Sequence, residues 1–544
     1  MIAEALMLSL VAYFGYCSNK FFGDSMVNRP LVTATLTGLV LGDLQMGLIM
    51  AGTLELTWMG VMYLGLSMPS DVTAGAIIGT AFAILTDSDA SVALAISIPA
   101  GMLCAYLATA IEVAISFLMH KCDEYAAKGE VGKINAIHLG AGFVKAFITS
   151  SVVFITVAVG TDAVSRLVDS CPEGIMNGLN VVSGLLPALG FAMLLNIMWD
   201  KRFIAFMFIG FILAVYLEMP VMAITVIAGA VAVIYFFLSE KKETVQVEDD
   251  LFGDDDSELT ETEEQPVTVM EADPEKKINK KDLISVFWRS FCHEASYNAE
   301  RQQALGFEFS LTKALKKLYK DDNDAYCEAC KRHTEFFNCT SQVCSFPVGV
   351  VLAMEEKNAN SKEKNLGPAI SAVKSALMGP MSAIGDTFFW GCFRVISASV
   401  GATLCMDGNI LGPIVFVILF NIPNIATHWF GVTLGYKLGD NFMNILGQDG
   451  LFQRLTDAAY ILGLTVVGAM TAGYINMTFG LQVTIGESVV GLQSVFDDIL
   501  LKLPALALTL IIAWLMRKKN VKAPFIIICL VIIGLLFGAF GILV

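Results

Sequence analysis

Ionisable and amide side chains inside apolar stretches are the first candidates for chemistry in this chain. Asp386, Arg394, Asn421 and His428 stand in runs that otherwise carry almost no charge. Because such groups are costly to bury in hydrocarbon, we expect them to face one another or a wet cavity. Asp386 and Arg394 are eight residues apart, so an ion pair between them requires a break in the helix. Interhelical hydrogen bonding explains Asn421 and His428 as well as ligand binding does.

A second candidate is a cluster of metal-ligating residue types within eighteen residues. It consists of Cys327, Cys330, His333, Cys339 and Cys344. A C-x2-C pair with further Cys and His nearby can hold zinc or an iron–sulfur cluster. The flanking sequence DAYCEACKRHTEFFN nevertheless favours a continuous helix, without the turn residues usual at zinc pairs. We therefore expect reduced thiols and no metal, as is the default for inward-facing parts of a membrane protein.

The elements that must position these residues are membrane helices. The mean hydropathy is +0.66 and only 16% of the residues are charged, well below the content of soluble domains. Residues 523–544 form an uncharged run of 22 residues, about the length that crosses a bilayer. The basic turn before it, Arg517 to Lys522, is predicted to face the cytoplasm by the positive-inside rule.

The first half alternates apolar stretches with short charged breaks. Gly, Pro and acidic residues inside several stretches predict broken or re-entrant helices, which are tolerated where the backbone lines a cavity. The N-terminal residues lack the basic region of a secretory signal, so we interpret them as mature structure. The apolar stretches lie at 31–62, 72–86, 90–118, 139–160, 179–198 and 203–238.

An acidic segment separates the two apolar halves. Residues 248–275 contain thirteen acidic side chains and no Lys or Arg, and they account for most of the net charge of −16. Such a segment cannot support a packed core, so we expect a disordered tether between two fused subunits. An ordinary acidic loop of a single transporter is the alternative.

The predicted fold class is an all-α polytopic membrane protein, with two membrane halves joined by the disordered acidic linker. The first membrane domain is expected at 1–240 and the linker at 241–281. The second domain is expected at 282–544, with an amphipathic cytoplasmic region at 282–365 and a membrane region at 366–544. Its first part has apolar residues at helical spacing, with lysines between them. These apolar residues are Leu305, Phe309, Leu315 and Leu318.

Long motifs in both halves resemble one transporter family. The second half carries HEASYNAERQQALGFEFSLTKALKKLY (293–319), RHTEFFN (332–338) and LMGPMSAIGDTFFWG (377–391), which resemble the IID component of mannose-type (mannose/fructose/sorbose) phosphotransferase-system sugar transporters. The first half resembles the IIC component of that family. Its matching motifs are NRPLVTATLTGLVLGD (28–43), GTLELTWMG (52–60), PSD (69–71) and CPEGIMNGLN (171–180).

The resemblance implies a sugar permease of the bacterial inner membrane, with the acidic linker on the cytoplasmic side. Separate IIA and IIB components would supply the phosphoryl group, so we expect no catalytic residue, metal or cofactor in this chain. The five His are not needed as phosphorylation sites if the phosphoryl group passes from IIB directly to the sugar. The resemblance also implies contact with membrane lipids and a homotrimer.

A sugar site needs groups that pair with hydroxyls, which both donate and accept hydrogen bonds. Carboxylates and amides meet this need, and they should line a water-accessible pocket because their burial without a ligand is costly. On the family's motifs, the predicted sugar-binding residues are Asp24, Glu55, Asp71, Asn298, Glu300, Gln303 and Asp386. Asn298 and Gln303 are five residues apart and do not align on a helix, which predicts a local turn between them.

Two positions depart from mannose-specific relatives. Met26 stands where these tend to carry glutamine, and Tyr63 where they tend to carry asparagine. Both changes remove amide donors, so the substrate stays open between an amino sugar, a ketose and another hexose. An ion-coupled secondary transporter, working through Glu55 or Asp386, is one alternative. A membrane receptor or scaffold is the other.

A basic segment at 311–333 is the predicted docking surface for IIB. A row of cations can steer an acidic or phosphorylated partner to the membrane face. Attraction to anionic lipid headgroups explains the same residues equally well. The cations are Lys313, Lys316, Lys317, Lys320, Lys331 and Arg332.

Overall fold

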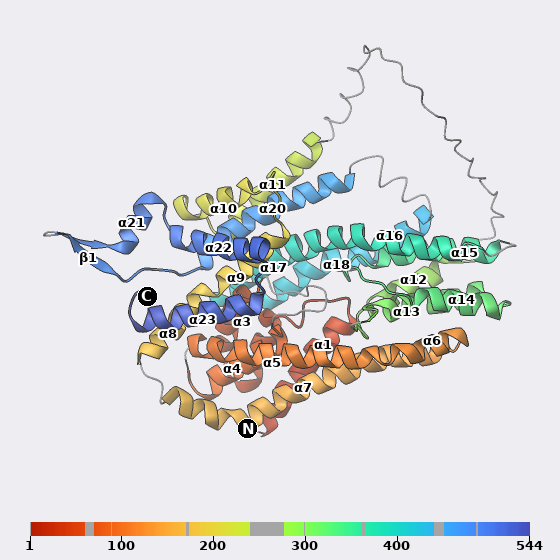
Figure 1. Cartoon of the computed structure of the whole chain (residues 1–544), viewed down its shortest axis with the longest axis horizontal. Helices are drawn as coiled ribbons and strands as arrows, with labels where there is room; N and C mark the ends of the chain where they lie inside the picture. The colour runs from red at the N-terminus through yellow and green to blue at the C-terminus, as the bar shows by residue number, and fades with distance from the viewer. Residues whose placement is uncertain are drawn as a thin grey trace, which may run out of the picture.

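The computed structural model describes residues 2–59, 70–88, 90–169, 173–239, 277–298, 300–361, 365–439, 451–485 and 488–543. The predicted acidic tether and Tyr63 lie outside these residues, as does the start of the CPEGIMNGLN motif. The described part is helical, as predicted for an all-α membrane protein (Figure 1). One small antiparallel hairpin departs from that expectation, formed by β1 (Gln482–Ile485) and β2 (Ser488–Gly491).

Eleven helices are described in the first half. They are α1 (Ile2–Phe21), α2 (Pro30–Leu41), α3 (Leu44–Thr57), α4 (Val72–Leu85), α5 (Ala90–Ser116), α6 (Met119–Ala127), α7 (Val131–Asp169), α8 (Glu173–Leu185), α9 (Pro187–Ile197), α10 (Ala205–Tyr216) and α11 (Val221–Ser239).

The second half begins with four helices, α12 to α15, in the region predicted to be amphipathic. Apolar residues of α13 such as Leu305 and Leu315 are buried, which confirms the helical spacing found in the sequence. The helices of the second half are α12 (Lys280–Ser290), α13 (Ala304–Leu318), α14 (Asn323–His333), α15 (Ser345–Asn360), α16 (Gly367–Gly385), the π-helix η2 (Asp386–Phe393), α17 (Arg394–Met406), α18 (Leu411–Leu438), α20 (Leu451–Tyr474), α21 (Leu492–Ile499), α22 (Leu503–Lys519) and α23 (Ala523–Ala539).

Four continuous helical segments in the described residues are long and apolar enough to cross a membrane. They are Ile96–Ala127, Val131–Gly160, Gly367–Met406 and Leu411–Leu438. The pair α21 and α22 would add a fifth, although it is bent by 78° at its break. Proline lies inside α5, α16 and α18, and a π-helix interrupts the α16–α17 rod. The bent α21–α22 pair agrees with the predicted broken helices, whereas α5, α16 and α18 continue through their prolines.

The C-terminal run is shorter than the sequence predicted. The expectation of one span over 523–544 is wrong, because α23 ends at Ala539 after 17 residues. Gly541 has a φ of 63°, a left-handed conformation that glycine adopts at low cost. The chain then turns back, and Leu543 forms a bridge with Phe479.

The two halves interlock instead of standing side by side. In Figure 1, α10 and α11 lie beside α20, and α8 lies beside α23. Glycines make the α10–α20 contact close: a Cβ on Gly210 would lie 1.9 Å from the Thr465 carbonyl oxygen, and one on Gly468 would lie 1.9 Å from the Met207 carbonyl oxygen. Small residues permit such backbone approach between membrane helices. The end of the first half is thus built into the second.

Candidate functional site

The loop between α1 and α2, residues 22–29, belongs to the first half and is hydrogen-bonded to the second. The Gly23 amide donates to the Phe291 carbonyl at 2.8 Å, and the Asn424 amide donates to the Gly23 carbonyl at 3.0 Å. The Asn421 amide donates to the Ser25 carbonyl at 2.8 Å. Residues of the second half therefore fix the backbone of this loop.

The loop has a strained backbone. Asp24 has a φ of 51° and Met26 a φ of 63°, although neither is glycine. Such conformations cost on the order of 1 kcal/mol each and persist where the surroundings impose them. Here the surroundings are the hydrogen bonds that Asn421 and Asn424 donate to the loop and the one that the Phe291 carbonyl accepts from it.

The Asp24 carboxylate lies between two amide side chains. Asn19 Nδ2 donates to Oδ1 at 2.5 Å, and Gln342 Nε2 donates to Oδ2 at 3.3 Å. Near these groups, three buried polar atoms have no hydrogen-bond partner among the described residues: Ser25 Oγ, Asn28 Oδ1 and Gln342 Oε1. Unsatisfied buried polar atoms are rare in folded proteins and indicate a place for water or a ligand.

Residues 339–342, between α14 and α15, bring several predicted site residues together. The Cys339 amide donates to Gln303 Oε1 at 2.8 Å, and Thr340 Oγ1 donates to Asp386 Oδ1 at 2.7 Å. The next residues, Ser341 and Gln342, bond to Glu294 and Asp24. Asp24, Gln303 and Asp386 thus surround one short segment, and we call residues 339–342 the hub segment.

Glu294 connects the hub segment to α1. Its Oε1 accepts from Ser341 Oγ at 2.5 Å and from Gln303 Nε2 at 3.1 Å. Lys20 Nζ lies 3.8 Å from its other carboxylate oxygen and 5.8 Å from the centre of the Tyr297 ring. Lys20 is 5% exposed, whereas the Glu294 side chain is 18% exposed, so the ion pair keeps some contact with solvent.

Glu55 occupies a different environment. Arg29 donates to Glu55 Oε1 from Nε at 3.0 Å and from Nη2 at 2.7 Å, and the Leu31 amide donates to Oε2 at 3.4 Å. Arg29 Nη2 also donates to the Trp58 carbonyl at 2.9 Å. The Glu55 side chain is 0% exposed. Its contacts fix α2 against α3, directly behind the 22–29 loop.

Asp71 caps a helix. Its Oδ1 accepts from the Thr73 and Ala74 amides at 3.0 Å, at the N-terminus of α4. Its Oδ2 accepts from the Tyr16 hydroxyl at 2.9 Å, which ties α4 to α1. The carboxylate therefore satisfies orphan amides as an N-cap does.

Asn298 and Glu300 lie in a turn, as the five-residue spacing predicted. Asn298 Oδ1 accepts from the Glu300 and Arg301 amides at 3.1 and 2.9 Å. Glu300 pairs with Arg301 at 3.4 Å, and Arg301 in turn pairs with Asp123 of α6 at 2.5 Å. Asn298 and Glu300 are thus connected to α6 through Arg301, whereas Gln303 contacts the hub segment.

The other buried polar residues form interhelical bonds. His428 Nδ1 lies 2.8 Å from Ser290 Oγ, and its ring stacks on Phe291 with centroids 4.2 Å apart. Arg394 donates to the Met59 carbonyl, and its guanidinium lies 4.6 Å from the Trp390 ring centre. The π-helix provides the break in the helix that an ion pair between Asp386 and Arg394 would require. Asp386 accepts a hydrogen bond from Thr340.

The RHTEFFN motif is built around one carboxylate, Glu355 of α15. Arg332 donates to it from Nε at 2.6 Å and from Nη2 at 3.1 Å, while His333 Nε2 lies 2.8 Å away and the Tyr319 hydroxyl 2.5 Å away. Burial opposes ionisation, but the hydrogen bonds from His333 and Arg332 outweigh it and lower the pKa of Glu355 to about 2. Burial lowers the pKa of His333, so we treat it as a neutral donor to Glu355.

The cysteine cluster is divided between two environments. Cys327 and Cys330 lie on α14, which is helical there as predicted, whereas Cys339 is the first residue of the hub segment and Cys344 lies two residues beyond its end. Within the described residues, no three His, Cys, Asp or Glu side chains gather as metal ligands.

Sequence reasoning missed four residues of this network: Asn19, Lys20, Glu294 and Gln342. Asn19 and Lys20 directly precede the 22–29 loop, and Glu294 stands second in the HEASYN motif. It also missed a buried ion pair between Lys145 and Glu112. Lys145 interrupts the apolar stretch 139–160, and a charge at such a position was a usable signal.

Comparison with known proteins divides the chain into the same two halves, on either side of the acidic segment. Residues 277–543 match the family model "PTS system mannose/fructose/sorbose family IID component", and residues 2–234 match "PTS system sorbose-specific iic component".

Separate relatives match the two halves. The second half is 41% identical over 275 residues to a mannose-specific EIID component of Escherichia coli K12, covering 49% of this chain and 96% of the relative. The first half is 32% identical over 244 residues to a mannose-specific EIIC component of the same organism, covering 44% of this chain and 89% of the relative. A solved structure described only as a membrane protein is 40% identical, covers 49% of this chain and all of its own, and has a TM-score of 0.46.

Proposed function

Because this chain belongs to the mannose/fructose/sorbose family of phosphotransferase-system sugar permeases, as a fusion of IIC and IID components, we propose that it binds a hexose or amino sugar between its two halves. In this proposal it translocates the sugar for phosphorylation by a separate IIB component. IIA in turn supplies phosphate to IIB.

The observation that carries the sugar site is the cluster around Asp24. It combines a carboxylate, the amides of Asn19 and Gln342, and the unpartnered atoms of Ser25 and Asn28. Sugar hydroxyls can donate to the free oxygens and accept from the amides, so one ligand would satisfy both kinds of group. The cluster takes residues from both halves, which agrees with a family that needs both components.

Glu294, Gln303 and Asp386 are proposed as groups that position the hub segment beside the sugar. Glu55, Asp71, Asn298 and Glu300 remain predicted sugar ligands. Each of these four already has protein partners, so direct sugar contact requires those partners to be exchanged or shared.

Met26 shapes the proposal for the substrate. Its side chain is 1% exposed and offers no hydrogen-bond donor on the 22–29 loop. We therefore propose a substrate that makes fewer amide contacts than mannose does in relatives with glutamine here. Amino sugars and ketoses belong in the test panel for this reason.

Sugar uptake in a bacterial strain lacking this chain tests the function. Restoring the chain together with IIA and IIB should restore accumulation of one hexose or amino sugar as its phosphate. Accumulation of unmodified sugar would instead support an ion-coupled secondary transporter. Failure to take up any member of the panel would support a receptor or scaffold.

The docking surface for IIB is proposed on the exposed face of α13 and the turn that follows it. Lys313, Lys316 and Lys320 are exposed and have no ion pair among the described residues. Three other predicted cations already have partners: Lys317 pairs with Asp282, Lys331 with Glu328, and Arg332 with Glu355. The proposed surface is therefore smaller than the sequence suggested.

The assembly is proposed as a homotrimer in the bacterial inner membrane, with the acidic linker in the cytoplasm. Exposed apolar side chains on α10, α11 and α18, among them Phe208, Phe237 and Ile422, supply surface for lipid or subunit contact. The linker joins the end of α11 to a segment that leads into the basic α12–α14 region, which the positive-inside rule assigns to the cytoplasm.

A further inference from the structure

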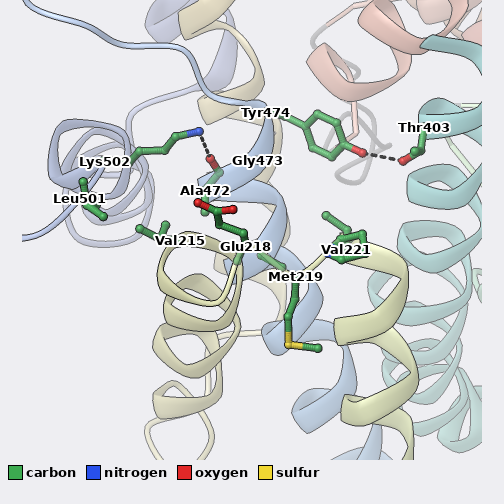
Figure 2. A pocket seen from close by; sticks show the side chains of 13 residues that line it. Val215, Glu218, Met219, Val221, Thr403, Ala472, Gly473, Tyr474, Leu501 and Lys502 are labelled. Carbon is green, nitrogen blue, oxygen red and sulfur yellow. Dashed lines mark hydrogen bonds between the residues drawn. The ribbon is translucent and has the colours of Figure 1, made fainter. Parts of the chain in front are cut away.

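A pocket of about 550 Å³ lies away from the Asp24 cluster, where the two halves meet at the ends of three apolar helices. It is bounded by the α10–α11 connection of the first half and by α17, α20 and the start of α22 in the second (Figure 2). Most of the residues that line it are apolar, including Val215, Met219 and Val221. Nothing in the sugar site uses this cavity.

Two opposite charges line the pocket. Glu218 and Lys502 both contribute to its wall, and both have left-handed backbones, with φ of 49° and 57°. Figure 2 shows the Glu218 carboxylate and the Lys502 ammonium pointing toward Ala472. Lys502 Nζ donates to the Ala472 carbonyl at 2.7 Å, which leaves further donors of its ammonium for a ligand. No ion pair joins Glu218 to Lys502 or to any other described residue.

The surroundings place the pocket at the level of lipid headgroups. Tyr216 and Tyr474 are the last residues of α10 and α20, and tyrosines gather at the membrane–water interface. Beside the pocket, exposed apolar side chains continue over Ile212, Leu217 and Leu501. A pocket bordered by such a surface is open to an occupant from the bilayer.

We propose that this pocket binds the headgroup of a phospholipid that carries both a phosphate and a primary ammonium. The Lys502 ammonium pairs with the phosphate, and the Glu218 carboxylate accepts from the ligand ammonium. The glycerol backbone and upper acyl chain pack on the apolar wall. A sugar fits less well, because its hydroxyls would lack partners along that wall. The bound lipid joins α10 and α11 to the second half.

Lipid retention by the purified full chain tests the proposal. Native mass spectrometry is used after equilibration with phosphatidylethanolamine, phosphatidylcholine or phosphatidylglycerol. We expect phosphatidylethanolamine to be retained about tenfold better than the other two, because only it offers both a phosphate and an N–H donor. Equal retention of all three lipids, or preferential retention of phosphatidylglycerol, would overturn the proposal.

Variants locate the bound lipid. Glu218→Gln and Lys502→Gln should each lower phosphatidylethanolamine retention by about three- to tenfold, whereas Lys502→Arg should largely preserve it. Val215→Trp fills the cavity and should abolish the selective retention. The controls Glu124→Gln and Lys121→Gln change exposed charges elsewhere and should leave it unchanged. If Val215→Trp retains the lipid as the parent chain does, the lipid binds elsewhere and the assignment is wrong.

The soluble headgroup and the sugar are the remaining probes. Free glycerophosphoethanolamine should not displace the lipid at equal concentration, because the apolar wall contributes to binding. Displacement by the transported sugar would instead assign the pocket to sugar and contradict the lipid site.

Discussion

At the scale of single residues, Asp24 joins the strained loop to the second half. Its backbone is held in a left-handed conformation, and its carboxylate faces one amide from each half. The side chain is 5% exposed, so an uncompensated charge here would be costly. The two amides compensate the carboxylate in part, and we propose that a sugar hydroxyl supplies a further hydrogen bond.

Asp24→Asn should weaken sugar binding by about ten- to a hundredfold, because a hydrogen bond to a charged group is typically worth about 1.5–3 kcal/mol. Calorimetry on the purified chain measures the effect. Asp43→Asn is the matched control, since Asp43 is an exposed cap of α3 and asparagine caps helices equally well. Parent-like affinity in Asp24→Asn would remove Asp24 from the site.

The ion pair between Glu55 and Arg29 predicts that Glu55→Gln chiefly lowers stability, because Arg29 would keep its charge without its buried partner. Breaking a buried pair costs about 3–5 kcal/mol, and replacing Arg29 as well should recover part of it. Thermal unfolding of Glu55→Gln, Arg29→Gln and the double variant measures this coupling. A direct sugar role predicts a different result: folding unchanged, with sugar affinity reduced in the single and double variants alike.

The sequence predicted which residue types would matter, but not their partners. Ionisable groups in apolar stretches are informative because burying them is costly, and this reasoning identified Asp386, whereas Asp24 and Glu55 were identified from the family's motifs. The hydrogen bond between Asp24 and Gln342 joins positions 318 residues apart, and no local pattern specifies it. Partner choice depends on helix packing, which only the structure shows.

At the scale of elements, helices were predictable and their ends were not. Apolar runs identified most of the membrane segments, and the Pro and Gly within them predicted breaks. The π-helix over Asp386–Phe393 and the 78° bend before α22 have no comparable sequence signature. The run 523–544 was misjudged because its length was considered without the turn at Gly541.

Glu355 anchors α14 and α13 to α15, so its ionisation should control the acid stability of this region. Its pKa in the folded chain is about 2, below its ordinary value of 4.5. The stabilisation is therefore complete above pH 4.5, and it is lost as the pH falls toward 2. Unfolding midpoints measured between pH 7 and 2 should fall steeply in the parent chain below pH 4.5.

Glu355→Gln should already be less stable at pH 7 and should lose this part of the pH dependence. Glu328→Gln, an exposed change on α14, is the control and should behave as the parent chain does. If Glu355→Gln keeps the parent pH profile, other carboxylates govern acid unfolding.

At the scale of the whole molecule, the order of the components was predictable but their interlocking was not. Motifs place IIC before IID along the chain. The packing of α10 on α20 and of α8 on α23 depends on close backbone approach at glycines such as Gly210 and Gly468, and these could not be paired from sequence.

The covalent link should be dispensable. Coexpressed fragments 1–245 and 276–544 should retain sugar uptake, because contacts between the halves, such as Arg202 with Asp457 and His138 with Ser296, do not involve the linker. Efficiency should fall, since the linker raises the effective concentration of one half near the other. Complete loss of uptake with both fragments at normal levels would contradict this prediction.

Reversing Lys316 and Lys320 to Glu should slow phosphosugar formation in vesicles supplied with IIA and IIB. Repulsion would lower the rate at which an acidic or phosphorylated partner reaches α13, while equilibrium sugar binding stays near that of the parent chain. Lys518→Glu with Lys519→Glu is a control for basic charge elsewhere on the chain. An unchanged phosphorylation rate would mean that IIB docks on another surface.

The strained 22–29 loop also bears on biogenesis. The first half leaves the ribosome before Phe291, Gln342, Asn421 and Asn424 have been synthesised, and these are the residues that hold the loop. A nascent first half therefore keeps only its own contacts to Asp24 and Met26, from Asn19 and Arg29, and we expect its half of the proposed sugar site to stay unformed. A IIC half in the membrane without its IID half would then neither bind sugar nor let it cross the membrane. Sugar binding and permeation would then begin only after the second half has been synthesised.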